Sequence, residues 1–268
     1  MKKTILLTGA TDGIGLVTAK MLVADGHHVL LHGRNPTKLE AVHQELSSSS
    51  NPGSVEAYVA DLSKLSDVEA LASSLLEKHN KLDILINNAG VLKTSNPIAE
   101  NGMDVRFVVN TIAPYLLTQR LLPIMDVTGR IINLSSAAQS SVDLRGLKGE
   151  IKLGDMDAYS QSKLAITMWS KVMAESLEDG PVVIAVNPGS LLGSKMVREG
   201  FGVAGGDLRV GATILCRLSL EEEFVHSSGL YFDNDAGRFG APHPDALNSA
   251  KSAEVVEMIE SILAAEQS

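Results

Sequence analysis

The segment TGATDGIG, Thr8 to Gly15, follows the short apolar run Thr4–Leu7 and precedes a helical pattern. Glycine at positions 9, 13 and 15 allows the tight turn and the close backbone approach that lead from a buried strand into a helix. The N–H groups at the start of such a helix can bind an anion such as a pyrophosphate. A turn without a ligand would also use glycine, and the spacing GxxxGxG differs from the commonest GxGxxG. Its place at the start of a strand–helix–strand unit favours a phosphate-binding loop.

Short apolar runs rich in β-branched residues recur along the rest of the chain. They are His28–Leu31, Val55–Ala60, Ile84–Ile86, Arg130–Leu134, Val182–Val186 and Gly229–Phe232. Near-continuous apolar runs predict strands that are buried on both faces, as in a parallel sheet. Helical patterns lie between and after them: Ile14–Asp25, Thr37–Leu46, Ser66–His79, Gly102–Leu122, Ala158–Glu178 and Ala253–Ala264. This alternation predicts an α/β doubly wound sheet in a single domain, residues 1–268, with a ligand at the carboxyl ends of the strands.

Composition excludes several classes of function. The formal net charge is -9 and Lys and Arg do not cluster, which argues against a nucleic-acid partner. The single cysteine, Cys216, excludes an intramolecular disulfide and a multi-cysteine metal site and suits a reducing compartment. No stretch approaches the ~20 apolar residues of a membrane span, and the apolar run Ile5–Leu7 is too short for an export signal. We therefore expect a cytoplasmic protein with no metal site and no membrane or nucleic-acid partner.

The residues after the second predicted strand bear on which dinucleotide would bind. NAD usually requires a carboxylate there to accept hydrogen bonds from the ribose 2′-hydroxyl, whereas the 2′-phosphate of NADP requires a cation. The sequence His32-Gly33-Arg34-Asn35 contains no acid, and the Arg34 guanidinium suits a phosphate, with Lys38 one turn further on. This favours NADP(H) over NAD(H). The alternative is that Arg34 is a solvated loop residue.

The pair Asp61-Leu62 ends the third predicted strand. The Asp61 carboxylate could accept a hydrogen bond from the adenine amino group while Leu62 covers the ring. Asp61 could equally be the N-cap of the helix that follows, since aspartate is a favoured N-cap residue.

Tyr159 and Lys163 lie four residues apart in a helical pattern, which places the phenol and the ammonium on one face. A phenol with an ordinary pKa of about 10 transfers protons poorly at neutral pH, but an adjacent cation favours the phenolate and lowers that pKa. Such a pair suits general acid–base catalysis. Many helices carry a Tyr-x-x-x-Lys pair by chance, so the spacing alone does not define a site.

The order of the motifs along the chain adds the missing context. After TGxxxGIG come Asn87-Asn88-Ala89-Gly90 at the end of the fourth strand and Ser135-Ser136 at the end of the fifth. They are followed by Tyr159-Ser160-Gln161-Ser162-Lys163 and, after the sixth strand, by Asn187-Pro188-Gly189. Together they resemble the short-chain dehydrogenase/reductase family over nearly the whole chain. The resemblance implies a single-domain Rossmann-type fold of about seven parallel strands and a catalytic tetrad of Asn, Ser, Tyr and Lys.

The resemblance also assigns roles to residues. It implies that Tyr159 donates or accepts the proton, and that Lys163 lowers the pKa of Tyr159 and holds the nicotinamide ribose. Ser136 would hydrogen-bond the substrate oxygen, since the family's serine is usually the second of this pair, and Ser135 would be structural. Asn110 matches the fourth member, which fixes a water molecule in a proton relay.

The cofactor is expected to lie along the carboxyl ends of the strands. The residues expected to contact it are Gly9, Thr11, Asp12, Gly13, Ile14, Gly15, Arg34, Asn35, Asp61, Leu62, Asn88, Ala89, Gly90, Tyr159, Lys163, Pro188, Gly189, Ser190 and Leu191.

Pro114 lies four residues after Asn110 within the predicted helix Gly102–Leu122. A proline inside a helix has no N–H and clashes with the carbonyl four residues earlier. We therefore hypothesise that Pro114 kinks this helix and leaves the Asn110 carbonyl free to bind the relay water. The alternative is a tolerated kink without a role.

Several features depart from the compact members of the family. The segment between Ser136 and Tyr159 is long, and with Arg34 and the late Gly-Leu-Tyr-Phe-Asp motif it is similar to the retinol-dehydrogenase-like or WW-domain oxidoreductase-like branch. The threonine that follows Pro-Gly in the family is represented only by Ser190 or Ser194. Residues 137–157 lack periodicity, and the glycine-rich segment Gly200–Gly206 is either a mobile lid or a plain loop.

These observations predict an NADP(H)-dependent oxidoreductase that interconverts a carbonyl and an alcohol by hydride transfer. The partner would be a small-molecule carbonyl or alcohol, and the resemblance implies a homodimer or homotetramer. A catalytically silent dinucleotide-binding sensor or scaffold is the alternative from another class. A third possibility is double-bond reduction or isomerisation on the same scaffold.

Overall fold

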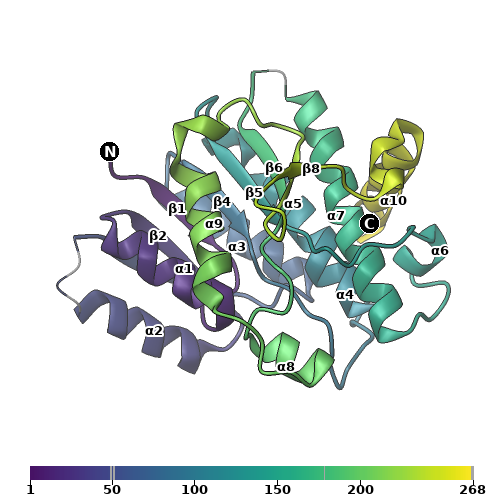
Figure 1. Cartoon of the computed structure of the whole chain (residues 1–268), viewed down its shortest axis with the longest axis horizontal. Helices are drawn as coiled ribbons and strands as arrows, with labels where there is room; N and C mark the ends of the chain where they lie inside the picture. Colours follow the sequence, from purple (N-terminus) through teal and green to yellow (C-terminus); the bar gives the residue numbers. More distant parts are fainter. Residues whose placement is uncertain (49, 51, 178, 267–268) are drawn as a thin grey trace.

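The computed structural model describes residues 1–48, 50, 52–177 and 179–266, which form a sheet between two layers of helices (Figure 1). Within this part of the chain the sheet has eight strands in the order β3-β2-β1-β4-β5-β6-β7-β8. The first seven are parallel, and β8 is antiparallel to β7. The strands are β1 (Thr4–Leu7), β2 (His28–Gly33), β3 (Ser54–Val59), β4 (Ile84–Asn87), β5 (Arg130–Leu134), β6 (Val182–Asn187), β7 (Tyr231–Asp233) and β8 (Arg238–Gly240). The predicted doubly wound α/β sheet is confirmed.

The helices connect successive strands and cover both faces of the sheet. They are α1 (Gly13–Ala24), α2 (Pro36–Ser48), α3 (Leu65–Lys78), α4 (Val105–Phe107), α5 (Ala113–Leu121), α6 (Leu144–Leu147), α7 (Asp155–Ser176), α8 (Lys195–Phe201), α9 (Leu208–Leu220) and α10 (Ser249–Glu266). Short 3-10 turns at Leu122–Ile124, Glu222–Phe224 and Pro244–Leu247 complete the described helical segments.

Alternate residues of each strand enter different layers, which explains the near-continuous apolar runs. In β1, Leu6 packs in the layer that contains α3, α5, α7 and α10. Its neighbours Ile5 and Leu7 pack in the opposite layer with α1, α2 and α9. All three side chains are fully buried. A strand buried on both faces cannot show the polar–apolar alternation of a half-exposed sheet.

Two predicted helices differ from the structure, and one observed strand was not predicted. The helix predicted over Gly102–Leu122 is divided into α4, a π-helical turn at Val108–Ile112, and α5. Helix α7 begins at Asp155, three residues before the predicted start at Ala158, and the predicted end at Glu178 lies outside the described residues. The aperiodic segment 137–157 therefore contains the short helix α6 and the first turn of α7. The eighth strand was not predicted, because its three residues are too few to show a period.

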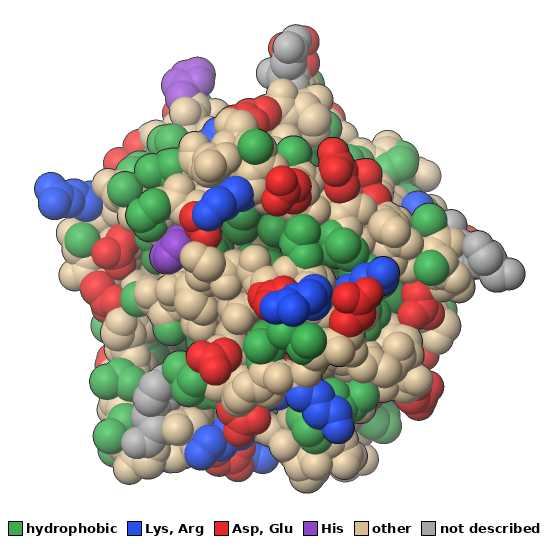
Figure 2. Space-filling model, turned by 90° about the vertical axis from the view of Figure 1, so that its right-hand side faces the viewer, with side chains coloured by type: hydrophobic (Ala, Val, Ile, Leu, Met, Phe, Trp, Pro, Cys, Tyr) green, Lys and Arg blue, Asp and Glu red, His purple; other side chains and the backbone are tan. Residues whose placement is uncertain are grey.

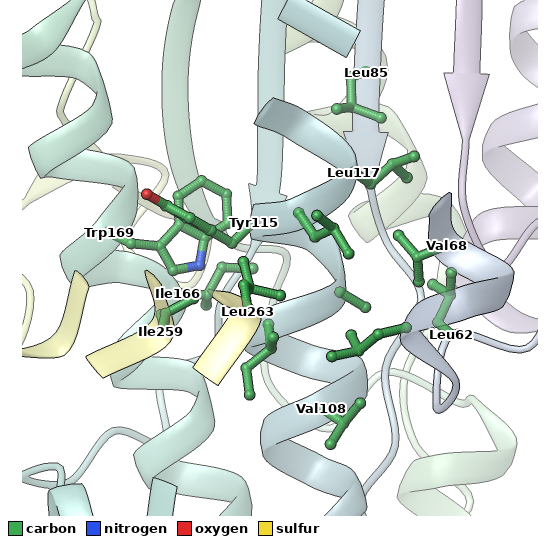
Figure 3. Packing of buried hydrophobic residues seen from close by; sticks show 14 of the residues in the cluster. Leu62, Val68, Leu85, Val108, Tyr115, Leu117, Ile166, Trp169, Ile259 and Leu263 are labelled. Carbon is green, nitrogen blue, oxygen red and sulfur yellow. The ribbon is translucent and has the colours of Figure 1, made fainter. Parts of the chain in front are cut away.

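The terminal helix α10 packs on α7 and completes the core. Ile259 and Leu263 point towards Ile166 and Trp169 of α7 in Figure 3. Trp169 is fully buried, and Tyr115 of α5 meets its indole edge to face, with ring centroids 5.5 Å apart. This aromatic pair therefore joins the helix that carries Tyr159 to two neighbouring helices.

The face shown in Figure 2 has acidic and basic side chains side by side, with apolar side chains between them. Lys and Arg do not form a basic patch on this face. This distribution matches the acidic net charge of the chain.

We expect Trp169→Ala to lower the free energy of unfolding by about 3–5 kcal/mol, because truncating a buried tryptophan loses transfer energy and leaves a cavity. Chemical denaturation followed by circular dichroism would measure this. The control is Val127→Ala, at a side chain 63% exposed, which should change the free energy by less than about 0.5 kcal/mol. Equal effects of the two substitutions would contradict the central place of Trp169.

Candidate active site

A cavity of about 850 Å³ opens at the carboxyl ends of the parallel strands. Doubly wound sheets bind ligands at this edge, where the strand order reverses between β1 and β4. All residues predicted to bind the cofactor line this one cavity, as do Ser136, Tyr159 and Lys163. Asn110 does not line it. The strand ends therefore bring together residues from Gly9 to Leu191 that the chain holds far apart.

The glycine loop is shaped by close backbone contacts. Gly9 and Gly13 have φ of +67° and +56°, in the left-handed region that favours glycine. A Cβ on Gly15 would lie 2.2 Å from the Gly9 carbonyl oxygen. Asp12 is the N-cap of α1, and its carboxylate accepts a hydrogen bond from the Gly13 N–H at 2.7 Å. The loop thus delivers the first turn of α1 to the cavity, as a phosphate-binding loop requires.

Two side chains from other strands hold this loop. Asn88, predicted only to line the cofactor, donates through its amide to the carbonyls of Thr8 at 2.8 Å and Gly9 at 3.0 Å. The buried His32 accepts from the Gly9 N–H at 3.2 Å, so its Nε2 carries the proton and donates to the Ala60 carbonyl at 3.0 Å. Burial lowers the pKa of His32 to about 4, which keeps the ring neutral.

The sequence reasoning missed this role of His32. In the sequence, His32 belongs to the segment at the end of the second strand that is notable only for lacking an acid. A histidine inside an otherwise apolar strand is the signal that could have marked it, because a buried imidazole needs hydrogen-bond partners.

The cationic side of the cavity lies after β2. Arg34 and Lys38 are exposed and line the cavity. Asn35 also lines it, and its side-chain oxygen accepts from the Lys38 N–H at 3.0 Å at the start of α2. The Asp61 carboxylate accepts hydrogen bonds from the N–H and the hydroxyl of Ser63 and so caps a turn. The N-cap of α3 is Lys64, so the alternative that Asp61 is this N-cap is wrong.

Tyr159 and Lys163 are buried on the face of α7 that borders the cavity. The Lys163 ammonium donates to the Leu134 carbonyl at 2.6 Å and lies 5.8 Å from the centroid of the Tyr159 ring. Burial lowers the pKa of Lys163 to about 8. Burial also raises the pKa of Tyr159, and a hydrogen bond with Ser136 partly opposes that rise. The net direction for Tyr159 is thus opposite to the lowering that the Tyr–Lys spacing alone suggested.

The two neighbouring serines have different partners. Ser135 Oγ bonds to the Lys163 carbonyl at 2.9 Å and to Thr167 Oγ1 at 2.7 Å, so it ties β5 to α7. Ser136 contacts the Tyr159 side chain and accepts from the Ala138 N–H at 3.1 Å. This arrangement puts the Ser136 hydroxyl beside the phenol.

Asn110 lies behind the cavity wall and is 1% exposed. Its amide accepts from the Val91 N–H at 2.8 Å and donates to the Val91 carbonyl at 2.9 Å and to Ser162 Oγ at 3.0 Å. The helix is irregular here, because the Ala113 N–H bonds the Val108 carbonyl five residues earlier. The predicted distortion next to Pro114 is therefore present as a π-helical turn. Binding of a relay water by the Asn110 carbonyl stays a prediction.

A buried arginine positions the start of α7. Arg106 is 1% exposed; its guanidinium donates to both carboxylate oxygens of Asp104, at 2.7 and 2.6 Å, and also to Asp155 in the first turn of α7. Asp155 lies four residues before Tyr159. The sequence did not indicate this contact, because Arg106 and Asp155 are 49 residues apart.

The loop after β6 is held by the hairpin β7–β8. Asp235 accepts from the Ser190 N–H at 2.8 Å, from the Ser190 hydroxyl and from the Asn187 amide at 2.9 Å. Leu191, next to this contact, adopts φ of 52°, a strained conformation for a leucine. Asp235 was not predicted as a site residue. The predicted Ser190 lines the cavity, but its hydroxyl is directed to Asp235.

The chain matches the family described as short chain dehydrogenase over residues 3–201. Human retinol dehydrogenase 13 is 32% identical over 264 residues, which cover 91% of this chain and 79% of that protein. Short-chain dehydrogenase TIC 32 A, chloroplastic, of Brassica napus is 30% identical over 254 residues, 85% of this chain and 79% of that protein. The solved Pseudomonas aeruginosa RhlG/NADP active-site complex shares the fold, with a TM-score of 0.70 and 24% identity over 88% of this chain and 95% of that one. The chain therefore belongs to the short-chain dehydrogenase family.

Membership makes the protein an oxidoreductase that acts on CH–OH and C=O groups with NAD(P). The relatives also confirm the retinol-dehydrogenase-like branch. Within the described part of the chain, no helix has both the length and the apolar character that crossing a membrane requires.

We expect Asp235→Ala to raise the KM for the dinucleotide about fivefold to thirtyfold, because it removes hydrogen bonds to a charged group, worth about 1–2 kcal/mol at this exposed position. Steady-state kinetics would measure KM, and thermal unfolding would check the fold. The control is Asp25→Ala, at an exposed carboxylate at the end of α1, which should leave KM unchanged. An unchanged KM in Asp235→Ala would contradict the role of this contact.

Proposed function

We propose that the protein is an NADP(H)-dependent oxidoreductase that interconverts a carbonyl and an alcohol, with Tyr159 as the general acid–base. The observation that carries the proposal is the Tyr159–Ser136 hydrogen bond beside the buried Lys163, in the same cavity as the glycine loop. General acid–base catalysis needs a proton donor in hydrogen-bond reach of the reacting oxygen. A hydroxyl pair in the cavity that the glycine loop lines would meet that need.

The residues around the cavity fit a nicotinamide dinucleotide. The close approach of Gly9 and Gly15 leaves no room for side chains at the loop, and α1 presents its N-terminus there. Arg34 and Lys38 stand where a 2′-phosphate requires cations, and neither Gly33 nor Asn35 offers a carboxylate. When bound, the cofactor supplies or accepts the hydride. We therefore propose NADP(H) as the preferred form, with NAD(H) as the alternative.

The side chains near the cavity would each have a separate role in binding the substrate and transferring its proton. In carbonyl reduction Ser136 hydrogen-bonds the substrate oxygen and Tyr159 protonates it; in alcohol oxidation Tyr159 removes that proton. Lys163 binds the nicotinamide ribose and stabilises negative charge on the phenol oxygen. Asn110 keeps its proposed relay role, which its place at the π-helical turn supports. Holding the reactants together supplies much of the rate advantage.

Apolar side chains form one part of the cavity wall beyond the glycine loop. Val91, Leu92, Val105, Val109 and Met196 line this part. Apolar walls favour a substrate whose carbonyl or alcohol is attached to an apolar body. Relatives named for retinol support a substrate of this kind.

Two further expectations stay proposals. A homodimer or homotetramer rests on the family resemblance, and a cytoplasmic location rests on the single buried thiol, Cys216. Sedimentation of the purified chain and fractionation of the source cell would test them.

We expect Tyr159→Phe to lower kcat for NADPH-dependent carbonyl reduction about 100-fold to 10,000-fold, because it removes the proton donor and keeps the ring. The affinity for NADPH should stay within about twofold. Absorbance of NADPH with a panel of apolar aldehydes and ketones would measure kcat.

The matched control is Tyr115→Phe, which removes a buried phenol hydroxyl that donates to Glu260 outside the cavity. It should keep full activity. Full activity in Tyr159→Phe would contradict the assignment. NADPH binding without turnover by the wild-type protein would instead indicate a sensor or scaffold.

We expect Arg34→Ala to raise the KM for NADPH about tenfold or more and to leave the KM for NADH almost unchanged. The reason is that a hydrogen bond to a charged group is worth about 1.5–3 kcal/mol, and only NADPH carries the 2′-phosphate. Kinetics with both cofactors would measure the two constants. Arg238→Ala, at an exposed arginine of β8, is the control. Equal changes for both cofactors would contradict the proposed preference.

Reduction should lose efficiency as the pH rises through about 8. The pKa of Lys163, about 8, is lower than its ordinary value, so its ammonium deprotonates there, while the raised pKa of Tyr159 keeps the phenol protonated. The pH profile of kcat/KM for NADPH reports the free protein and would show this fall. In Lys163→Arg, whose guanidinium stays charged, the fall should disappear. A flat wild-type profile up to pH 10 would contradict the prediction.

A further inference from the structure

Three side chains of metal-binding type converge near the amino ends of β2 and the edge strand β3, away from the cavity. His28 begins β2, Glu56 lies in β3, and His79 is the C-cap of α3. In the parallel pairing of β2 with β3, His28 lies opposite Ser54 and Leu30 opposite Glu56. His28 and Glu56 are therefore diagonal neighbours on the same face of the sheet, and the end of α3 brings His79 to that face.

The ligand atoms are close enough for one ion. His28 Nε2 lies 3.1 Å from one Glu56 oxygen, and His79 Nε2 lies 3.5 Å from the other. One ligand atom from each residue lies within 4.8 Å of the other two. Ligands about 2.0–2.1 Å from a tetrahedral zinc ion are about 3.3 Å from one another. Each histidine nitrogen lies near this distance from a different Glu56 oxygen, so a rotation of the carboxylate would bring one oxygen to both nitrogens.

Neighbouring hydroxyls orient these ligands. Ser54 Oγ lies 2.7 Å from His28 Nδ1, so it can accept the Nδ1 proton when Nε2 is used as a ligand. Tyr58, which is 5% exposed, donates its hydroxyl proton to Glu56 at 2.8 Å, and its oxygen accepts from His79 Nε2, also at 2.8 Å. Zinc binding at His79 Nε2 would replace that second hydrogen bond. Metal-binding histidines and carboxylates usually have such partners. His28 and His79 are 19% and 13% exposed, so an ion can reach them while the protein holds their rings.

We propose that His28, Glu56 and His79 form a zinc site. Two imidazoles and one carboxylate are a donor set that suits Zn²⁺ rather than Ca²⁺ or Mg²⁺, which prefer oxygen alone. The C-terminal end of α3 adds partial negative charge beside the ion. The ion would tie the edge strand β3 to β2 and α3. Water would complete the four-coordinate shell. The ion would act by holding these elements together, since the cavity lies at the opposite ends of the strands.

Isothermal titration of the metal-free, full-length protein with ZnCl₂ tests the site. We expect one Zn²⁺ per chain with micromolar affinity, a rise in the unfolding temperature on addition of zinc, and visible absorption of a four-coordinate Co²⁺ ion on substitution. His28→Ala and His79→Ala should each weaken zinc binding at least about tenfold. Tyr58→Phe, which keeps the three ligands, should weaken it less than either histidine variant.

Matched controls are His226→Ala, at an exposed histidine, and His43→Ala, at a half-buried histidine of α2. Neither should change zinc binding. If His28→Ala or His79→Ala unfolds, anomalous diffraction at the zinc edge from wild-type crystals places the ion directly. Absence of micromolar binding, unchanged binding in the histidine variants, or an ion located elsewhere would each overturn the proposal and show that the cluster is held by hydrogen bonds alone.

Discussion

The close packing of the glycine loop against neighbouring backbone is the constraint on which the candidate site depends. A Cβ on Gly9 would lie 2.9 Å from the Cα of Ala89, and a Cβ on Gly15 would lie nearer still to the Gly9 carbonyl. Only glycine tolerates such distances. Asn88 and His32 bond to this loop from β4 and β2, so three strand ends form one hydrogen-bonded unit. That unit shapes the cavity and positions the N-terminus of α1 at its wall.

Burial sets the pKa values of the Tyr159 and Lys163 side chains, which form the other half of the site. Tyr159 and Lys163 sit on a helix packed on all sides, so their charged forms are poorly solvated and the pKa of each moves towards the neutral form. The Leu134 carbonyl accepts a hydrogen bond from the Lys163 ammonium and so partly replaces the water that burial removes. Under the proposed function, cofactor and substrate would share this cavity, which would bring the acid–base group and the hydride together.

Much of this site was predictable because its signals are local in the chain. The glycines at 9, 13 and 15, the Tyr159–Lys163 spacing and Pro114 all act within a few residues, through backbone sterics or helix periodicity. The contacts of His32, Arg106 and Asp235 were not predictable. Each of them connects segments whose proximity follows only from strand order and loop path, such as Asp235 with Ser190, 45 residues earlier.

By itself, the sequence determined the doubly wound α/β sheet and the glycine loop. The order of its motifs, through the family resemblance, indicated further residues that line the cavity. Apolar periodicity and backbone sterics act over short distances and leave a direct record in the order of residues. Only the tertiary structure decided which side chains hold the cavity residues in place and that the pKa of Tyr159 is raised. It also brought His28, Glu56 and His79 together at the far edge of the sheet. Burial and contacts between distant segments exist only after the strands have paired, so no local pattern encodes them.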